Sequence, residues 1–185
     1  MAEENNRLKS FVIGVAGSMA GLLAMRAYWQ KAAPWVQDTV NLSGTEAYPE
    51  SADLDDIAQV DRQYKGDESA TDALGRMAYQ AVTGREPETE EKKKQLSELV
   101  HWVYGMLQGG LYGIWRSGSR LPSLKSGALF STGLWLLGDE VTVPMLGLQS
   151  GPTAVAPKSH INRLGAHLAY GITTSLVSRV LHKLL

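Results

Sequence analysis

The residues best placed to do chemistry are two adjacent acids, Asp139 and Glu140, which directly follow the uncharged run 126–138. They fall within LWLLGDEVTV, residues 134–143, which otherwise has the composition of an apolar helix. Two carboxylates are costly to bury in such surroundings unless other groups compensate them. We therefore expect partners among the ionisable residues of the other apolar stretches, which are Arg26, His101, Arg163 and His167.

This polar cluster has three interpretations. Its charges can simply neutralise one another and fix the register of packed helices. Alternatively, adjacent carboxylates repel each other and imidazoles titrate near neutral pH, which predicts a site that responds to pH or handles protons or small ions. The third interpretation is a metal site made of His101, His167, Asp139 and Glu140. Arg163 beside these ligands and the lack of a metal-motif spacing count against it, so we expect no metal.

No motif indicates an enzyme. The chain has no cysteine, which removes disulfides, thiolate metal sites and cysteine nucleophiles. A nucleophile elbow and a phosphate-binding loop are also missing, because the glycine-rich stretches lie inside apolar segments where helix packing explains them better. Lys and Arg number 18 against 19 acids, and they form no broad basic surface for nucleic acid. We expect a non-enzymatic protein with no cofactor and no nucleic-acid partner.

Four apolar segments must position the cluster, at about residues 11–29, 98–116, 124–148 and 160–184. Each approaches the roughly 20 residues that a membrane-spanning helix needs. The pattern predicts an all-α fold, an integral membrane bundle of four transmembrane helices. Two alternatives stay open. The first segment resembles a signal peptide because basic residues precede it, and the short third and fourth apolar cores also suit a soluble helical bundle.

Glycines recur at a four-residue spacing in the first two of these segments. They are Gly17 and Gly21 in the first segment and Gly105, Gly109 and Gly113 in the second. Small residues let helix backbones approach closely in lipid, where dispersion packing replaces the hydrophobic effect. We therefore expect these residues to lie at helix contacts.

The chain divides into three parts by composition. Residues 1–29 form a tail and the first helix, residues 30–97 form an extracytoplasmic polar segment, and residues 98–184 hold the second to fourth helices. Pro34 and Pro49 interrupt the beginning of the polar segment. Because proline breaks helices, irregular structure is predicted there.

The polar segment contains one predicted amphipathic helix, at about residues 69–83. Ser69 and Asp72 have the spacing of a capping box, and Gly84 is placed to end the helix. The apolar residues that follow at helical spacing are Ala70, Leu74, Met77, Ala78, Ala81 and Val82. We expect this helix to lie on the bundle or on the membrane surface, and binding a partner is an alternative.

Basic residues mark alternate ends of the four predicted spans. They are Arg7 and Lys9, then Arg116, Arg120 and Lys125, then Arg179 and Lys183. Cytoplasmic flanks tend to carry lysine and arginine, so both termini are predicted to lie in the cytoplasm. Asp139 then lies roughly 22 Å from the cytoplasmic start of its helix, at about 1.5 Å per residue. The same argument puts the whole polar cluster in the outer half of the membrane.

A short repeat relates the first two spans to the last two. The motif H-x-x-Y-G occurs at residues 101–105 and again at residues 167–171. A weaker echo, G-x-x-x-S, joins residues 14–18 with residues 127–131. The pattern fits two repeated hairpins related by an axis along the membrane normal.

Several motifs together resemble a known family. They are L-V-H-x-x-Y-G-x-x-x-G-x-x-Y-G at 99–113, L-W-x-x-G-D-E-x-x-x-P at 134–144 and H-x-x-Y-G at 167–171, after a glycine-rich first helix. This combination resembles the YagU-like family of uncharacterised bacterial inner-membrane proteins, over about residues 11–29 and 97–183. The resemblance implies a multi-span helical protein of the cytoplasmic membrane. It implies no established activity and transfers no catalytic residue.

The sequence thus predicts a membrane protein, in contact with the lipid bilayer, whose polar cluster responds to external pH or handles protons or small ions. The alternative is an accessory structural subunit of a larger membrane complex. Its partners would be other membrane proteins or a second copy of the chain, because the glycine ridges and the long polar segment leave surface for them.

Overall fold

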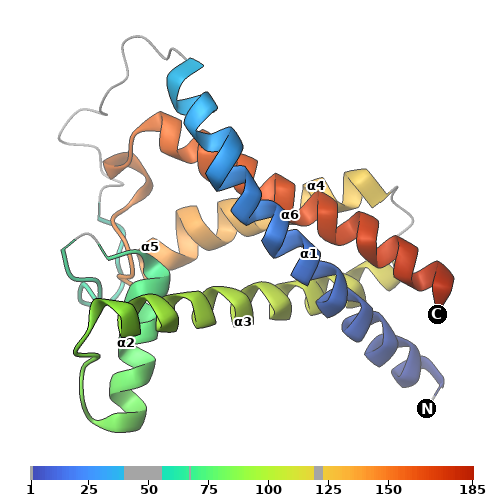
Figure 1. Ribbon diagram of the computed structural model, residues 1–185, viewed down its shortest axis with the longest axis horizontal. Helices are drawn as coiled ribbons and strands as arrows, with labels where there is room; N and C mark the ends of the chain where they lie inside the picture. Colours follow the sequence, from blue (N-terminus) through green and yellow to red (C-terminus); the bar gives the residue numbers. More distant parts are fainter. Residues whose placement is uncertain (1, 40–55, 67, 119–122) are drawn as a thin grey trace. The chain divides into compact units, whose positions relative to one another are not determined.

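The structure is a computed structural model that describes residues 2–39, 56–66, 68–118 and 123–185 (Figure 1). Every regular element in these ranges is helical, so the predicted all-α class is confirmed. The elements are α1 (Ala2–Thr39), α2 (Ala70–Thr83), α3 (Glu90–Ser117), α4 (Ser123–Gly133), the π-helical η1 (Leu134–Thr142), α5 (Val143–Met145), the 3-10 turn η2 (Pro152–Ala154) and α6 (Pro157–Leu184).

The chain folds into two compact units, each built from segments that are distant in sequence. The first unit contains Met1–Ser43, Tyr104–Trp135 and Lys158–Leu185, and the second contains Gly44–Val103 and Leu136–Pro157. Helix α3 and the helical run from α4 to α5 each continue from one unit into the other. The division therefore differs from the three consecutive parts that composition suggested.

Local signals set the ends of several helices. At the start of α2, the Ser69 hydroxyl accepts a hydrogen bond from the Asp72 N–H at 3.3 Å, and the Asp72 carboxylate accepts one from the Ser69 N–H at 3.0 Å. Gly84 ends α2 in the left-handed region, with φ of 71°. The predicted capping box and C-cap are confirmed. The Lys92 N–H likewise donates to the Thr89 hydroxyl at 3.2 Å, so Thr89 caps α3.

Helix α1 is longer than the sequence predicted. It continues through Pro34 to Thr39, so the expectation of irregular structure from residue 30 onward is wrong for residues 30–39. A proline inside a helix removes one backbone hydrogen bond. Pro34 is exposed, so its ring faces outward on a helix that the residues before it have already formed.

Close backbone approach holds the helices of the first unit together. A Cβ atom at Gly14 on α1 would overlap the carbonyl of Gly109 on α3, and a Cβ at Gly109 would overlap Ser18. On its other side, α1 meets α6 at Gly17 and Gly21, and Figure 1 shows this crossing of the blue and red helices. Contacts of the same kind join Gly105 to Leu22 and Gly113 to the Ser10 carbonyl. Close approach thus occurs at the five glycines selected from the sequence.

Helices α4 and α6 repeat the contact that joins α1 and α3. Gly127 and Ser131 on α4 both meet Gly171 on α6, much as Gly14 and Ser18 both meet Gly109. The G-x-x-x-S echo in the sequence therefore corresponds to similar contacts in the two helix pairs. The Tyr170 hydroxyl also donates a hydrogen bond of 2.6 Å to the Gly105 carbonyl, which joins the two H-x-x-Y-G motifs.

The first unit places small polar side chains inside and large apolar side chains outside. The buried hydroxyl-bearing residues are Ser10, Ser18, Tyr112, Ser123, Ser126, Ser131, Tyr170, Thr174, Ser175 and Ser178. Exposed apolar residues include Leu8, Val12, Met19, Leu23, Leu107, Leu111, Leu124, Leu129, Leu176 and Val180. Lipid or a protein partner can cover exposed apolar side chains of this kind.

Hydropathy alone supports one of the four predicted spans. Among the described residues, one helix, Asn6–Val36 within α1, is long and apolar enough to cross a membrane. Its mean hydropathy reaches 1.6 in its most apolar window, 44% of which is buried. The other predicted spans score lower because α3 and α6 mix polar with apolar residues. The third predicted span is divided into α4, η1 and α5, which are all shorter than a span.

A buried ion pair anchors α2 in the second unit. The Arg76 Nε lies 2.9 Å from Glu68 Oε1, and Arg76 also donates to the Gln63 carbonyl at 2.5 Å. Arg76 is 6% exposed, and its guanidinium holds the pKa of Glu68 below its ordinary value. A lowered carboxylate pKa means that the pair stabilises the fold above the ordinary pKa of glutamate. That contribution is lost only as pH falls through the lowered value.

Helix α2 buries a different side from the one that its apolar pattern suggested. Its buried residues are Ala73, Gly75 and Arg76, and Gly75 packs against Leu96 of α3. Leu74 and Val82 of the predicted apolar face are 39% and 87% exposed. The ion pair and the small residues decide which face packs, and the apolar face stays on the surface.

The glycine contacts generate a testable prediction. We expect Gly109→Ala to lower the stability of the chain by about 1–3 kcal/mol, because the added methyl overlaps Ser18 and forces α1 away from α3. Gly133→Ala is the matched control, since no atom lies within 4 Å of its added methyl. Thermal unfolding in a mild detergent measures both variants. Equal unfolding midpoints for the two variants would contradict the packing argument.

Candidate functional site

The acid pair selected from the sequence lies in a π-helical segment. Helix α4 continues into η1 (Leu134–Thr142), and α5 ends the helical run at Met145, within the predicted segment 124–148. In a π-helix each N–H donates to the carbonyl five residues earlier. This arrangement is rare in proteins, and where it occurs it is often at a functional site. The sequence predicted a helix here but not its widening, because no residue type marks a π turn.

The two acids differ in burial. Glu140 is 6% exposed, whereas Asp139 is half-buried. Side chains also serve carbonyls of the π-helical segment: the Thr142 hydroxyl donates to the Leu137 carbonyl at 2.6 Å, and the Gln149 amide donates to the Asp139 carbonyl. Gln149 therefore ties the loop after α5 to the residue beside Glu140. The segment therefore contains one buried carboxyl group, that of Glu140. Side-chain hydrogen bonds to the carbonyls of Leu137 and Asp139 hold its backbone in place.

The other predicted cluster residues are distributed over both units. His101 is half-buried in the second unit, which also holds the acid pair. Arg26, Arg163 and His167 belong to the first unit. Arg26 is exposed on α1, so its side chain is not buried with the predicted polar cluster.

Arg163 and His167 lie one turn apart on α6, as their spacing predicted. His167 Nδ1 lies 2.9 Å from the Arg163 carbonyl oxygen. A carbonyl oxygen only accepts, so Nδ1 carries the hydrogen of this contact. This arrangement fixes the orientation of the imidazole on the half-buried part of α6.

The metal interpretation receives no support from the described residues. Within those ranges, no group of three or more His, Cys, Asp or Glu side chains is arranged to hold a metal ion.

The first unit also contains a buried hydroxyl network that the sequence analysis missed. The Tyr112 hydroxyl of α3 lies 2.6 Å from the Ser175 hydroxyl of α6 and 2.9 Å from the Ser126 hydroxyl of α4. Ser175 and Ser126 in turn both donate to the Ser123 carbonyl, at 2.6 and 3.0 Å. The signal was present as serines spaced three residues apart on α4 and on α6. It carried little weight because serine is common in helices of either environment.

The network predicts a specific cost for losing one hydroxyl. We expect Tyr112→Phe to lower stability by about 1–2 kcal/mol, because Ser126 and Ser175 lose a buried hydrogen-bond partner. Tyr79→Phe on α2 is the control, since it keeps the ring that faces the Lys92 ammonium. The unfolding midpoint in detergent is the measurement. An unchanged midpoint in Tyr112→Phe would show that the network contributes nothing.

Comparison of the chain with protein-family models, with curated proteins and with solved structures found no match. The resemblance to the YagU-like family therefore stays a prediction from the motifs. The function is therefore inferred from the side chains and contacts of this chain.

Proposed function

We propose that this chain is a non-enzymatic protein of the bacterial inner membrane whose acid pair responds to external pH or handles protons or small ions. The observation that carries the proposal is Glu140, buried in a π-helical segment of an otherwise apolar run. Ionisable residues within membrane helices are costly and usually functional. Glu140 is therefore the residue whose protonation would be coupled to a change in the protein.

The distribution of side chains in the first unit supports the membrane setting. Large apolar side chains face outward, and small residues with hydroxyls lie at the helix contacts, which is the pattern of helices packed in lipid. This also explains the low hydropathy of α6. The residues that reduce it include Asn162, Thr174, Ser175 and Ser178, and all four are buried within the unit.

The proposed topology has four spans: α1, the later part of α3, the run from α4 to α5, and α6, with both termini in the cytoplasm. The similar glycine–serine contacts in the two helix pairs support a design of two repeated hairpins. In that orientation the acid pair, His101 and His167 lie toward the outer surface, where external protons would reach them.

Single cysteines test the topology, because the chain has none of its own. We expect a membrane-impermeant thiol reagent to label Gln80→Cys in intact cells and to leave Ser117→Cys unlabelled until the cells are broken. Both side chains are exposed, so access depends only on the side of the membrane. The reverse pattern would invert the topology. Labelling of neither residue in intact cells would favour a soluble bundle.

A second experiment tests the acid pair itself. We expect the tryptophan fluorescence of the reconstituted protein to change with external pH, because Trp135 lies on the same π-helical segment as Glu140. Glu140→Gln should remove that pH response. Glu98→Gln, an exposed acid on α3, is the control and should leave it unchanged. Glu68 does not interfere, because Arg76 holds its pKa low. A normal titration in Glu140→Gln would refute the proposed role.

An accessory role in a membrane complex is the second candidate, and the exposed face of α2 favours it. Leu74 and Val82 offer apolar surface that nothing in their own unit covers fully. We expect such a subunit to co-purify with defined partner chains in mild detergent, and Val82→Glu to reduce their yield. A protein that purifies alone, with its pH titration intact, would favour the first proposal.

A further inference from the structure

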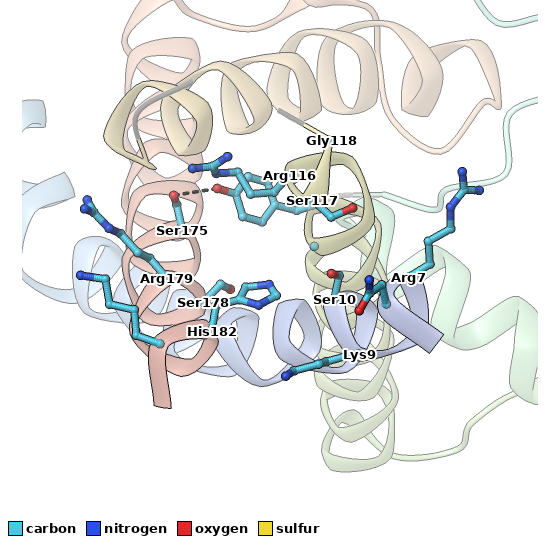
Figure 2. Close-up of a pocket in the computed structure, with 14 residues that line it drawn as sticks. Arg7, Lys9, Ser10, Arg116, Ser117, Gly118, Ser175, Ser178, Arg179 and His182 are labelled. Carbon is cyan, nitrogen blue, oxygen red and sulfur yellow. Dashed lines mark hydrogen bonds between the residues drawn. The ribbon is translucent and has the colours of Figure 1, made fainter. Parts of the chain in front are cut away.

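The first unit contains a cavity of about 700 Å³ where three helix ends meet: the start of α1 and the ends of α3 and α6 (Figure 2). Basic side chains from all three helices line it, namely Arg7, Lys9, Arg116, Arg179, His182 and Lys183. None of the described residues that line the cavity is an aspartate or a glutamate. Residues that the sequence marked only as basic flanks thus surround one space.

Buried hydroxyls form another part of the lining. Ser10, Ser175 and Ser178 are 3%, 2% and 4% exposed, and all three line the cavity. The Tyr112 hydroxyl donates a hydrogen bond of 2.6 Å to Ser175, and both residues line the cavity, so the cavity adjoins the hydroxyl network. Figure 2 draws this bond as the dashed line at Ser175. Ser175 and Ser178 already donate their hydroxyl hydrogens to the carbonyls of Ser123 and Ile13, so Ser10 is the one of the three whose hydroxyl suits a phosphate oxygen. Phosphate oxygens accept hydrogen bonds from hydroxyls and, more strongly, from charged groups, and this lining contains both.

Part of this convergence has a structural role. Cations at the ends of α3 and α6 suit the helix dipoles, and Lys9 of α1 donates a hydrogen bond of 2.9 Å to the Leu185 carbonyl oxygen. A preference for basic cytoplasmic flanks would put these residues on one side of a membrane without requiring a shared cavity.

We propose that this cavity binds a phosphate-bearing anion, held by the side chains of Arg116, Arg179 and Lys183 and by the Ser10 hydroxyl beside them. Guanidinium groups bind phosphate oxygens in a fork, and the lysine adds a point charge. Two sources present this chemistry, the headgroup of an anionic phospholipid and a soluble phosphate. The site does not involve the acid pair and is independent of the function proposed for it.

The test uses the full chain in a mild non-ionic detergent. We expect its unfolding midpoint to rise with short-chain phosphatidylglycerol or with pyrophosphate, but not with short-chain phosphatidylcholine or with chloride at matched ionic strength. A rise with the anionic lipid alone identifies the headgroup as the source. A rise with pyrophosphate alone identifies a soluble phosphate, and either result supports the site. No rise with either anion would overturn the proposal.

Variants locate the effect in the cavity. Arg179 and Lys183 are exposed, so Arg179→Gln and Lys183→Gln should fold normally. We expect each to weaken binding of the effective anion by roughly tenfold, through loss of one charge-assisted contact. Lys125→Gln removes the same charge from an exposed residue of α4 outside the cavity, and should bind as the unmodified chain does. Unchanged affinity in the double variant Arg179→Gln/Lys183→Gln would refute the site.

Discussion

The architecture of the first unit depends on how closely its helix backbones approach one another. Gly14, Gly17 and Gly21 bring α1 against α3 on one side and α6 on the other, with no space for a Cβ atom at any of them. At this separation there is room between the helices only for small side chains, so serine hydroxyls become interior groups. Several of these hydroxyls donate to backbone carbonyls, as Ser18, Ser126 and Ser131 do, because an unpaired buried polar group is expensive. The polar interior is therefore a consequence of the glycine contacts.

The same packing determines what remains outside. With the interior filled by small residues, the leucines, valines and methionines of these helices cover the surface. In the proposed membrane setting, that surface is satisfied by lipid tails, which are as apolar as the side chains themselves. The charged groups are then concentrated where the helices end, and the convergence of those ends produces the basic cavity. The close approach of the helix backbones thus connects the hydroxyl network, the apolar exterior and the basic cavity.

Sequence reasoning succeeded where a local signal decides the structure. The capping box at Ser69 and the C-cap at Gly84 are examples, since each depends on hydrogen bonds within a few residues. It failed where tertiary contacts decide. The apolar pattern of α2 gave the wrong packing face, because the Arg76–Glu68 ion pair involves a residue outside the helix. Pro34 predicts a break in the first helix, but α1 continues through it, and the proline lies at the surface. The π-helical widening and the basic cavity left no mark in composition, because both arise from register and from the meeting of distant helix ends.

The π-helical segment has a consequence for how this chain has to be compared with its relatives. A π turn accommodates an additional residue within a helix, so the faces of α4 and α5 are not related by the ordinary period of 3.6 residues. A related chain one residue shorter in this stretch could form a regular helix of similar length, with its later side chains rotated by about 100°. An acid in the position of Glu140 would then face elsewhere. Equivalence of the acids between relatives must therefore be judged from helix phase on each side of residues 134–142, and not from a continuous alignment.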